Sequence, residues 1–241
     1  MTKPILTSLY AYGHNIGKRN PQHFKGTEQT YEPKQQNRTH RRLQKSVNTY
    51  IRVVYKSESQ RQIIEQFIQC QYKKHFNAQI HHFFPVLISV YQQSNDELIA
   101  VVGVRYADQG TLFAEQYLSK PVEQSLAQHA GQIVPRTAVI ELGHFAIINR
   151  RYLALVVRAI ANFISQLEVE WLVYSVSQPM VKAMHRLHIP SRFMDFARAE
   201  KWVDRDNPCE QYDPLKPAVY CFQIATVIQA INNTKGVYDC C

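Results

Sequence analysis

The chain has 241 residues, of which 45% are apolar and 20% charged, and its formal net charge is +9. This length and composition fit one globular domain with an appended segment. No apolar run reaches the roughly 18 residues that a membrane-spanning helix needs, because Arg158 interrupts the best candidate, LALVVRAIANFI. The five cysteines form no CxxC pair, so a structural metal site is not expected.

The basic charge is concentrated at the start of the chain. Residues 1–56 hold 11 Lys and Arg against Glu28 and Glu32, whereas the remaining residues are balanced, 17 against 17. Because the segment 1–48 is also polar and has little apolar periodicity, we expect a flexible leader there, followed by a single domain over 49–241. The leader is either a solubilising tail or an arm that attracts an acidic partner: anionic lipid, nucleic acid or an acidic carrier protein. The first residues lack the apolar region of a secretion signal, which predicts a soluble, cytoplasmic protein.

The rest of the chain alternates between strand and helix patterns. β-branched and aromatic runs predict strands, and apolar residues at helical spacing predict helices. Two runs on either side of the polar segment 94–97 predict an antiparallel hairpin. In chain order we expect a strand at 48–55, a helix at 57–76, hairpin strands at 85–92 and 98–106, a two-piece helix at 111–131, a strand at 137–147, a helix at 149–167, a strand at 170–176, a helix at 178–189 and strands at 191–196 and 218–227. This order predicts an α/β (α+β) domain with a mixed sheet and helices on both faces.

One strand carries two groups that packing alone would not select. In VIELGHFA, residues 139–146, Glu141 and His144 interrupt an apolar run. Glu141 lies near the carboxyl end of a central strand, where ligands of such sheets usually bind. The sequence therefore singles out this strand as the candidate site.

Three blocks of sequence resemble one protein family. LFAEQYL (112–118), VIELGHFA (139–146) and YDPLKPAV (212–219) are similar to blocks of the thermostable hemolysin family. That family is similar to the GNAT acyltransferase superfamily and, within it, to the acyl-homoserine lactone synthases, whose strand motif is E-x-S-R-F-A. Here glutamate, phenylalanine and alanine keep their places, but glycine replaces the serine and histidine the arginine: Glu141, Leu142, Gly143, His144, Phe145, Ala146. The glycine-rich R-x-x-G-x-G loop of the superfamily is absent, and Asn149-Arg150-Arg151 stands in its place.

The resemblance implies a GNAT-fold N-acyltransferase. Such an enzyme moves an acyl group, including a fatty one, from an acyl carrier protein or acyl-coenzyme A to a small amine, with the thioester as co-substrate and no tightly bound cofactor. The donor is expected to contact Phe145 and Ala146. Its phosphate is expected at Asn149, Arg150 and Arg151, where a helix begins and backbone N–H groups attract anions. The alternative is a helix that starts with solvated arginines.

Acyl transfer to an amine needs a proton acceptor and a donor for the developing oxyanion. Glu141 is the predicted general base, and a bulge at Gly143 would bring His144 to the same side of the strand. The alternatives are a structural carboxylate that binds backbone N–H groups and a packed histidine. On the acceptor side we expect Arg105, for a carboxylate of the acceptor, with Glu115 and Tyr117; core packing is the alternative for Tyr117.

A second reading is a directly membrane-active hemolysin that uses the basic leader and an amphipathic helix on anionic bilayers. Nucleic-acid binding by the leader is not expected, because no recognised module accompanies it. Hydrolysis by a nucleophilic serine is also not expected, since the chain has no Gx-Ser-xG elbow.

Overall fold

The computed structural model describes residues 29–31, 48–197 and 217–234. They form a single mixed sheet of eight strands in the order β1-β2-β3-β4-β5-β6-β8-β7. The strands are β1 (Gln29–Tyr31), β2 (Thr49–Tyr55), β3 (Val86–Gln92), β4 (Glu97–Tyr106), β5 (Val139–Ile147), β6 (Trp171–Val176), β7 (Arg192–Phe196) and β8 (Ala218–Gln223). All neighbours are antiparallel except β5 and β6, which are parallel because α3 crosses between them.

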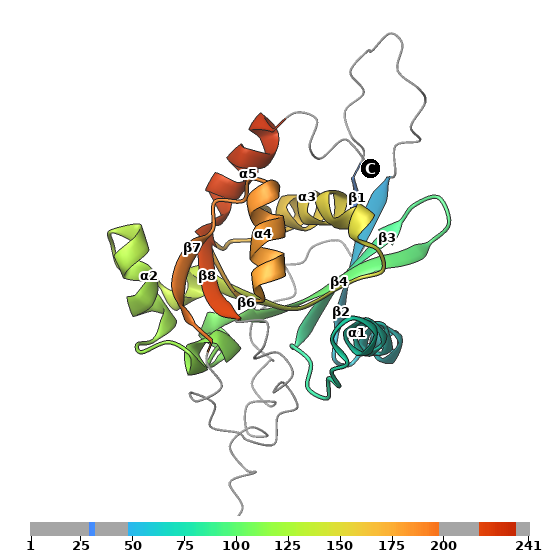
Figure 1. The fold of residues 1–241 in the computed structure, drawn as a ribbon, viewed down its shortest axis with the longest axis horizontal. Coiled ribbons are helices and arrows are strands. Elements are labelled where there is room, and N and C mark those ends of the chain that lie inside the picture. The colour runs from blue at the N-terminus through green and yellow to red at the C-terminus, as the bar shows by residue number, and fades with distance from the viewer. Residues whose placement is uncertain (1–28, 32–47, 198–216, 235–241) are drawn as a thin grey trace, which may run out of the picture.

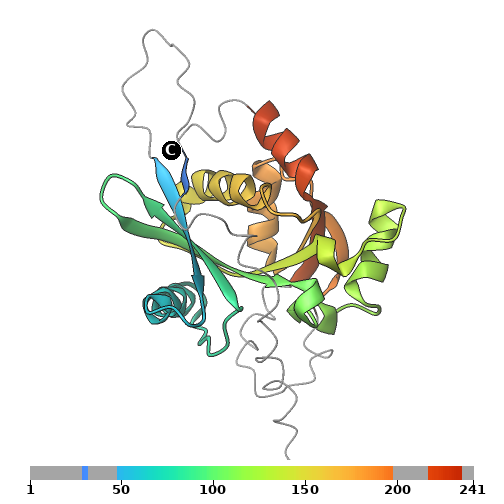
Figure 2. The same cartoon turned by 180° about the vertical axis from the view of Figure 1, so that it is seen from behind.

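Helices cover both faces of the sheet (Figures 1 and 2). One face carries α1 (Arg61–Phe76) and, over the other end, the 3₁₀ helix η6 (Phe113–Gln116) with α2 (Val122–Ala130). The opposite face carries α3 (Leu153–Ile164), α4 (Gln178–Arg186) and α5 (Ile224–Asn233). Shorter 3₁₀ turns are η5 (Ala107–Gln109), η7 (Arg136–Ala138) and η8 (Arg150–Tyr152). The predicted mixed sheet with helices on both faces is confirmed.

The main core lies between the sheet and α3. Alternate residues of the central strands, such as Ile88, Val102 and Ile140, are fully buried there against Val156 and Ile160 of α3. A second core packs α1 on the other face through Ile64 and Ile68. Because the central strands are buried on both faces, their sequences read as continuous apolar runs. Glu141 is the one carboxylate among the fully buried residues that the structure describes.

Two element boundaries differ from the sequence-based expectations. Helix α1 begins at Arg61, where a helix was expected from residue 57, and it has no side-chain cap. In the predicted leader, residues 29–31 form β1, which pairs with β2, and residues 1–28 and 32–47 lie outside the described residues. The run 218–227 was expected to be one strand, but it is a strand only to Gln223, and α5 begins at the next residue. The pattern of a short apolar run does not show where a strand ends and a helix begins.

Strand β5 changes its partners halfway along. Its first half pairs with β4 and β6, and the last pair with β6 is Leu142 with Tyr174. Beyond that point β5 continues only with β4, while β6 continues only with β8 as far as Val176. The two parallel strands therefore part after Leu142 and Tyr174, and the sheet is open between them.

Candidate functional site

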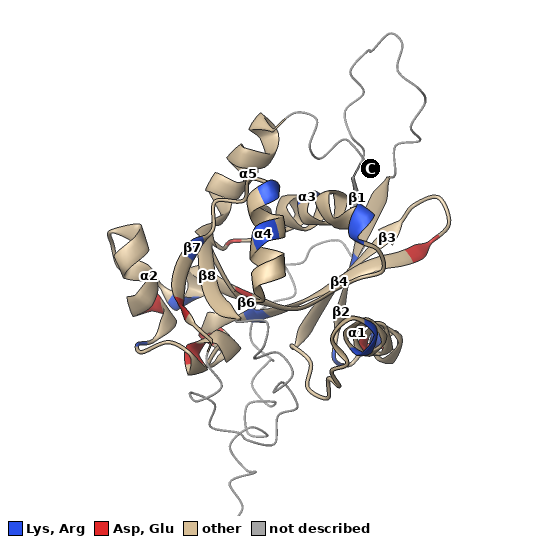
Figure 3. Cartoon of the chain, viewed as in Figure 1, with Lys and Arg blue, Asp and Glu red and all other residues tan. Residues whose placement is uncertain are grey.

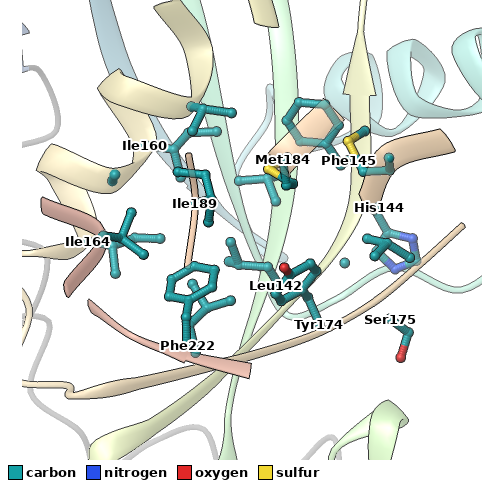
Figure 4. Close-up of a pocket in the computed structure, with 18 of the residues that line it drawn as sticks. Leu142, His144, Phe145, Ile160, Ile164, Tyr174, Ser175, Met184, Ile189 and Phe222 are labelled. Carbon is teal, nitrogen blue, oxygen red and sulfur yellow. The ribbon is translucent and has the colours of Figure 1, made fainter. Parts of the chain in front are cut away.

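A mostly apolar cavity lies where β5 and β6 part (Figure 4). It has a volume of about 150 Å³. Its wall comes from β4, β5, β6, β8, α3, α4, α5 and the end of α1, so it reaches elements on both faces of the sheet. The apolar lining includes Leu142, Phe145, Ile160, Ile164, Leu172, Met180, Met184, Ile189, Phe222 and Val227.

The cavity has a polar end and an apolar end. Figure 4 shows His144 and Ser175 together at one end, while Ile164 and Phe222 lie at the other. His144 comes from β5 and Ser175 from β6, the two strands that part. Such a shape fits an amphiphilic ligand, with a polar group between the strands and an apolar chain packed against α3 and β8.

A β-bulge positions His144. Gly103 of β4 pairs with Gly143, but Val101 pairs with Ala146, so β5 has one residue more than β4 over this stretch. The predicted bulge is therefore present, but the unusual backbone falls on His144, whose φ is +51°, and not on Gly143. A left-handed conformation costs a non-glycine residue about 1 kcal/mol or more. The fold thus holds the imidazole in a conformation that the residue alone would not choose.

Phe84 and two glycines clamp the imidazole. The ring of Phe84 meets that of His144 edge-on with centroids 4.6 Å apart. A Cβ at Gly143 would lie 2.7 Å from Cζ of Phe84, and a Cβ at Gly103 would lie 3.0 Å from Cδ2 of His144. Both glycines are therefore needed for close approach of side chains, which explains a glycine inside each strand.

A buried arginine holds the segment that carries Phe84. Arg61, 5% exposed, donates hydrogen bonds to the carbonyl oxygens of Phe84 (2.6 Å), Pro85 (3.2 Å) and Val54 (3.3 Å), and it pairs with Glu65. Arg105 lies over the Phe84 ring, 4.6 Å from its centroid. The position of the His144 ring is consequently set by neighbours that are themselves fixed.

His144 is polar without a protein partner. Its Nε2 is shielded from solvent and has no hydrogen-bond partner among the described residues, and the same holds for Oγ of Ser175. Burial, helped by the positive charges of Arg105 and Arg61, lowers the pKa of His144 to about 3. The imidazole is therefore neutral at physiological pH.

Glu141, by contrast, is fully satisfied by the protein. Its Oε2 accepts a hydrogen bond from the backbone N–H of Phe113 (2.7 Å), and its Oε1 accepts one from Ala114 (2.8 Å). The side chain is 1% exposed and does not line the cavity. Burial raises its pKa to about 7, against the opposing effects of Arg105 and the two N–H groups. This geometry matches the alternative of a structural carboxylate that anchors η6.

The bulge does not pair Glu141 with His144. No hydrogen bond or ion pair between them is found among the described residues, and Phe84 packs beside Gly143, between their positions on the strand. Arg105 faces Glu141 across the β4–β5 ladder and donates to the carbonyl oxygen of Thr111 (3.3 Å). It therefore stays beside the carboxylate, outside the cavity.

Glu115 and Tyr117 lie under α2, away from the cavity. Glu115 accepts hydrogen bonds from Arg136 (2.7 and 3.0 Å) and from the backbone N–H groups of Leu112 and Val122. Burial alone would raise its pKa, but Arg136 and the N–H groups outweigh burial and lower it. Tyr117 is 2% exposed and packs edge-on against Phe113. Both residues hold the segment between β4 and β5 together, and the core alternative for Tyr117 fits best.

The predicted donor residues divide into two groups. Phe145 lines the cavity, whereas Ala146 is buried beneath α1. Asn149 uses its Oδ1 to accept the backbone N–H of Arg151 (3.0 Å), which occupies one of the N–H groups expected to bind phosphate. Asn149, Arg150 and Arg151 are exposed at the start of η8 and α3, directly after β5.

Several cavity residues escaped the sequence analysis. Tyr174 and Ser175 lie near the carboxyl end of β6, and the two methionines Met180 and Met184 follow on α4. The signal for Ser175 is its position near the carboxyl end of the strand parallel to β5. Glu141 was expected at the corresponding end of β5, but it is the third residue of that strand and lies in its first half. Phe84 had no signal, because it acts from a loop that precedes β3.

Neither a membrane span nor a metal centre is found in the part of the chain that the structure describes. None of its helices has both the length and the apolarity to cross a bilayer. Within the same residues, no three His, Cys, Asp or Glu side chains gather as metal ligands would.

Comparison with solved structures shows that the fold is similar to that of an acyl-homoserine lactone synthase. The acyl-homoserine lactone synthase LasI has a TM-score of 0.51 at 11% identity, covering 78% of this chain and 96% of that one. FeeM, an N-acyl amino acid synthase from uncultured soil microbes, has a TM-score of 0.49 at 10% identity, covering 76% and 95%. A GCN5-related N-acetyltransferase from Brucella melitensis has a TM-score of 0.43 at 10% identity, covering 76% and 79%. At these identities the likeness concerns the fold.

Sequence comparison gives the family. No match is found among curated protein sequences. The sequence profile of the thermostable hemolysin family, however, matches residues 43–228, which include every described strand and helix from β2 to β8. The chain therefore belongs to the thermostable hemolysin family.

Proposed function

We propose that this protein is an N-acyltransferase that moves an acyl group, including a fatty one, from the thioester of an acyl carrier protein or of coenzyme A to a small amine. The observation that carries the proposal is the opening between β5 and β6, with an apolar cavity behind it. An acyl thioester has a matching shape: a polar thioester between two stretches of apolar or amide-bearing chain. The GNAT-like fold and its acyl-transferring neighbours support the same class of reaction.

The cavity suits the acyl chain. Its far end is closed by Ile164 and Phe222, and Met180 and Met184 supply flexible apolar side chains that adapt to different chains. Each methylene group that enters contributes about 0.8 kcal/mol of transfer free energy. Affinity is therefore expected to rise with chain length until the chain fills the cavity and to fall beyond that length.

The unpaired edges of the two strands suit the amides of phosphopantetheine. Past Leu142 and Tyr174, the backbone of β5 and β6 pairs with none of the described strands on the side where the two strands face each other. An extended amide chain that enters there can form strand-like hydrogen bonds with either edge. This arm is common to both donor types, so it does not distinguish the carrier protein from coenzyme A.

The face with α3 and α4 is suited to an acidic donor. Neither helix contains an acidic residue, and Figure 3 shows Lys and Arg on α4 and at the start of α3. Arg150, Arg151, Lys182 and Arg186 are all exposed. We assign the phosphate of the donor to Arg150 and Arg151, and an acidic carrier surface to α4.

The reaction is a balanced acyl transfer. The acceptor nitrogen attacks the thioester carbon, a C–N bond forms, and the carbonyl electron pair moves onto oxygen. Collapse of this oxyanion breaks the C–S bond, and the proton lost by the amine ends on the departing thiol. Because both oxygens of Glu141 already accept backbone hydrogen bonds, we assign that residue to positioning η6, and the amine loses its proton to water.

The test is a donor panel. Purified full-length protein is incubated with acyl carrier protein and acyl-coenzyme A donors of increasing chain length, together with mixed amines, and thiol release and product masses are measured. We expect thiol release that depends on amine and shows an optimum in chain length. Thiol release that is independent of amine, or absent with every donor, would contradict the proposal.

Two charge variants separate the donors. Lys182→Glu with Arg186→Glu is expected to weaken the carrier-protein donor about five- to tenfold at low salt, and less at high salt. A pantetheine donor without a carrier is expected to be unaffected. The matched control, Lys56→Glu with Lys120→Glu, reverses two exposed charges elsewhere on the chain and is expected to leave both donors unchanged.

Lysis of red cells supplies a further readout. An amphiphilic N-acyl product is itself able to disturb membranes, so the proposal predicts lysis only when donor and amine are present. Lysis by protein that is free of any acyl donor would instead support a directly membrane-active protein.

A further inference from the structure

Two residues that line the cavity each carry a buried polar atom without a hydrogen-bond partner among the described residues, and one comes from each of the strands that part. The two atoms are Nε2 of His144 on β5 and Oγ of Ser175 on β6. A buried polar group without a hydrogen bond lowers the stability of the folded protein. Two such groups at the same end of one cavity indicate a place where a polar atom of a ligand is held (Figure 4).

Three features of the structure fix the position of the His144 ring. The bulge adds one residue to β5 at this point, and His144 takes the left-handed backbone conformation. The absence of a Cβ at Gly103 leaves room for the ring, since a Cβ there would lie 3.0 Å from Cδ2. Phe84 then holds the ring edge-on. A residue that only filled space would not need these features, because an apolar ring packs in the same slot without an unpaired nitrogen.

The surroundings also decide which chemistry the imidazole can perform. Arg105 and Arg61 are the charged groups whose fields act on it, and both disfavour a second proton. A group that resists protonation is a poor general base at neutral pH. A neutral imidazole remains a good hydrogen-bond donor through the nitrogen that carries its proton.

We propose that His144, through Nε2–H, and Ser175, through its hydroxyl, bind the carbonyl oxygen of the donor's acyl group and stabilise the oxyanion that forms there. This inference rests on the proposed acyl transfer and assigns the donor group that the reaction requires. It places the thioester carbon between β5 and β6 at the polar end of the cavity, with the acyl chain running toward Ile164 and Phe222. It requires the imidazole tautomer with its proton on Nε2.

The test compares two stable analogues of decanoyl-pantetheine. In the ketone, a methylene group replaces the sulfur and the carbonyl remains; in the thioether, the carbonyl is missing. We expect the wild-type protein to bind the ketone about five- to tenfold more tightly than the thioether, measured by calorimetry. Because this ratio is measured on the unaltered chain, it does not depend on whether any variant folds.

Variants then show which side chains produce the ratio of ketone to thioether affinity. His144→Phe keeps an aromatic ring in the slot but removes the N–H, and we expect the ratio to fall to about one. Ser175→Ala is expected to lower it about threefold. His188→Phe is the matched control, because His188 is an exposed histidine that also has a positive φ, +57°, and does not line the cavity; its ratio is expected to equal that of the wild type.

Turnover supplies the second readout. With a true thioester donor, His144→Phe is expected to lower kcat by about a hundredfold, whereas the affinity for the thioether stays within about twofold. Equal binding of ketone and thioether by the wild type, or a ratio that survives in His144→Phe, would overturn this inference while acyl transfer itself stands. If the wild type binds neither analogue and releases no thiol from any donor, the proposed function fails, and this inference fails with it.

Discussion

The two halves of β5 treat their polar residues in opposite ways. In the first half, which is paired on both sides, Glu141 is buried and both of its oxygens accept backbone hydrogen bonds. In the second half, which is bulged and pairs with β4 alone among the described strands, His144 is half-buried, and its shielded Nε2 has no hydrogen-bond partner among the described residues. One strand thus contains a polar group that the fold uses and a polar group that the fold leaves free.

This difference between Glu141 and His144 shows which buried polar residue still lacks a structural explanation. A carboxylate in an apolar strand suggests catalysis only while its partners are unknown, because burial without partners is costly. Once two N–H groups are found to bind it, the carboxylate is explained by the segment that it anchors. The imidazole is not explained in this way, since it adds an unpaired nitrogen and a strained backbone to the protein.

The largest expected effect concerns acid stability and His144. Its pKa is about 6.5 in the unfolded chain and about 3 in the folded one. Between these values the unfolded state binds a proton that the folded state does not, so stability falls as the pH is lowered from 6.5 to 3. The slope is at most about 1.4 kcal/mol per pH unit, or about 5 kcal/mol across the window.

Denaturant unfolding of the wild type and of His144→Phe over that pH range measures this contribution. The variant has no group to protonate at this position, so its stability should depend less on pH in the acid range. Parallel curves for the two proteins would mean that the ring is protonated without penalty, and the contrast between the halves of β5 would lose its basis.

The next effect tests the other half of the strand through Glu141→Gln. The pKa of Glu141 is raised from 4.5 to about 7, so between these values the folded state keeps a proton that the unfolded state loses. Stability therefore falls as the pH rises through this window, by up to about 3 kcal/mol, and glutamine has no such dependence. The difference in stability between wild type and variant should consequently shift in favour of the variant from pH 4.5 to 7.

Activity decides whether Glu141 has a second role. If it only anchors η6, turnover per folded molecule of Glu141→Gln stays within about tenfold of the wild type. If it acts as the general base that the sequence suggests, turnover falls by about two to four powers of ten with little change in stability. Thiol release, normalised to the folded fraction, distinguishes the two.

The sequence predicted the fold well because the fold depends on local patterns. The hairpin of β3 and β4, the crossover through α3 and the strand β6 all follow from apolar periodicity and turn residues. The chain's family was accessible from three short blocks. Apolar periodicity does not predict the end of β8, because one apolar run changes from strand to helix between Gln223 and Ile224.

The site was only partly predictable, because its features depend on neighbours distant in sequence. The sequence pointed to β5 and to a bulge beside Gly143, and the bulge is present. It could not show that Glu141 faces the N–H groups of Phe113 and Ala114, 28 and 27 positions away. Nor could it show that Phe84 presses on Gly143 or that Ser175 completes the polar end of the cavity, since those contacts exist only after the sheet forms.

The smallest expected effect is that of Gly143→Ala, at the point where the two halves of β5 meet. A methyl group there would lie 2.7 Å and 2.8 Å from ring atoms of Phe84, so in Gly143→Ala that ring must move. Overpacking of this kind typically costs about 1–3 kcal/mol. Because the Phe84 ring also holds the imidazole of His144, its displacement should weaken the binding of a ketone analogue more than that of a thioether.

Gly131→Ala is the matched control for this last prediction. Gly131 ends α2 with a φ of +71°, and a Cβ there would meet nothing within 4 Å. Its replacement costs about 1 kcal/mol of backbone strain but touches no residue of the cavity. Melting temperatures of both variants are expected to fall, whereas the ratio of ketone to thioether affinity should change only in Gly143→Ala. An equal ratio in both variants would show that the clamp of Phe84 on His144 is not what positions the imidazole, and that the bulge alone is sufficient.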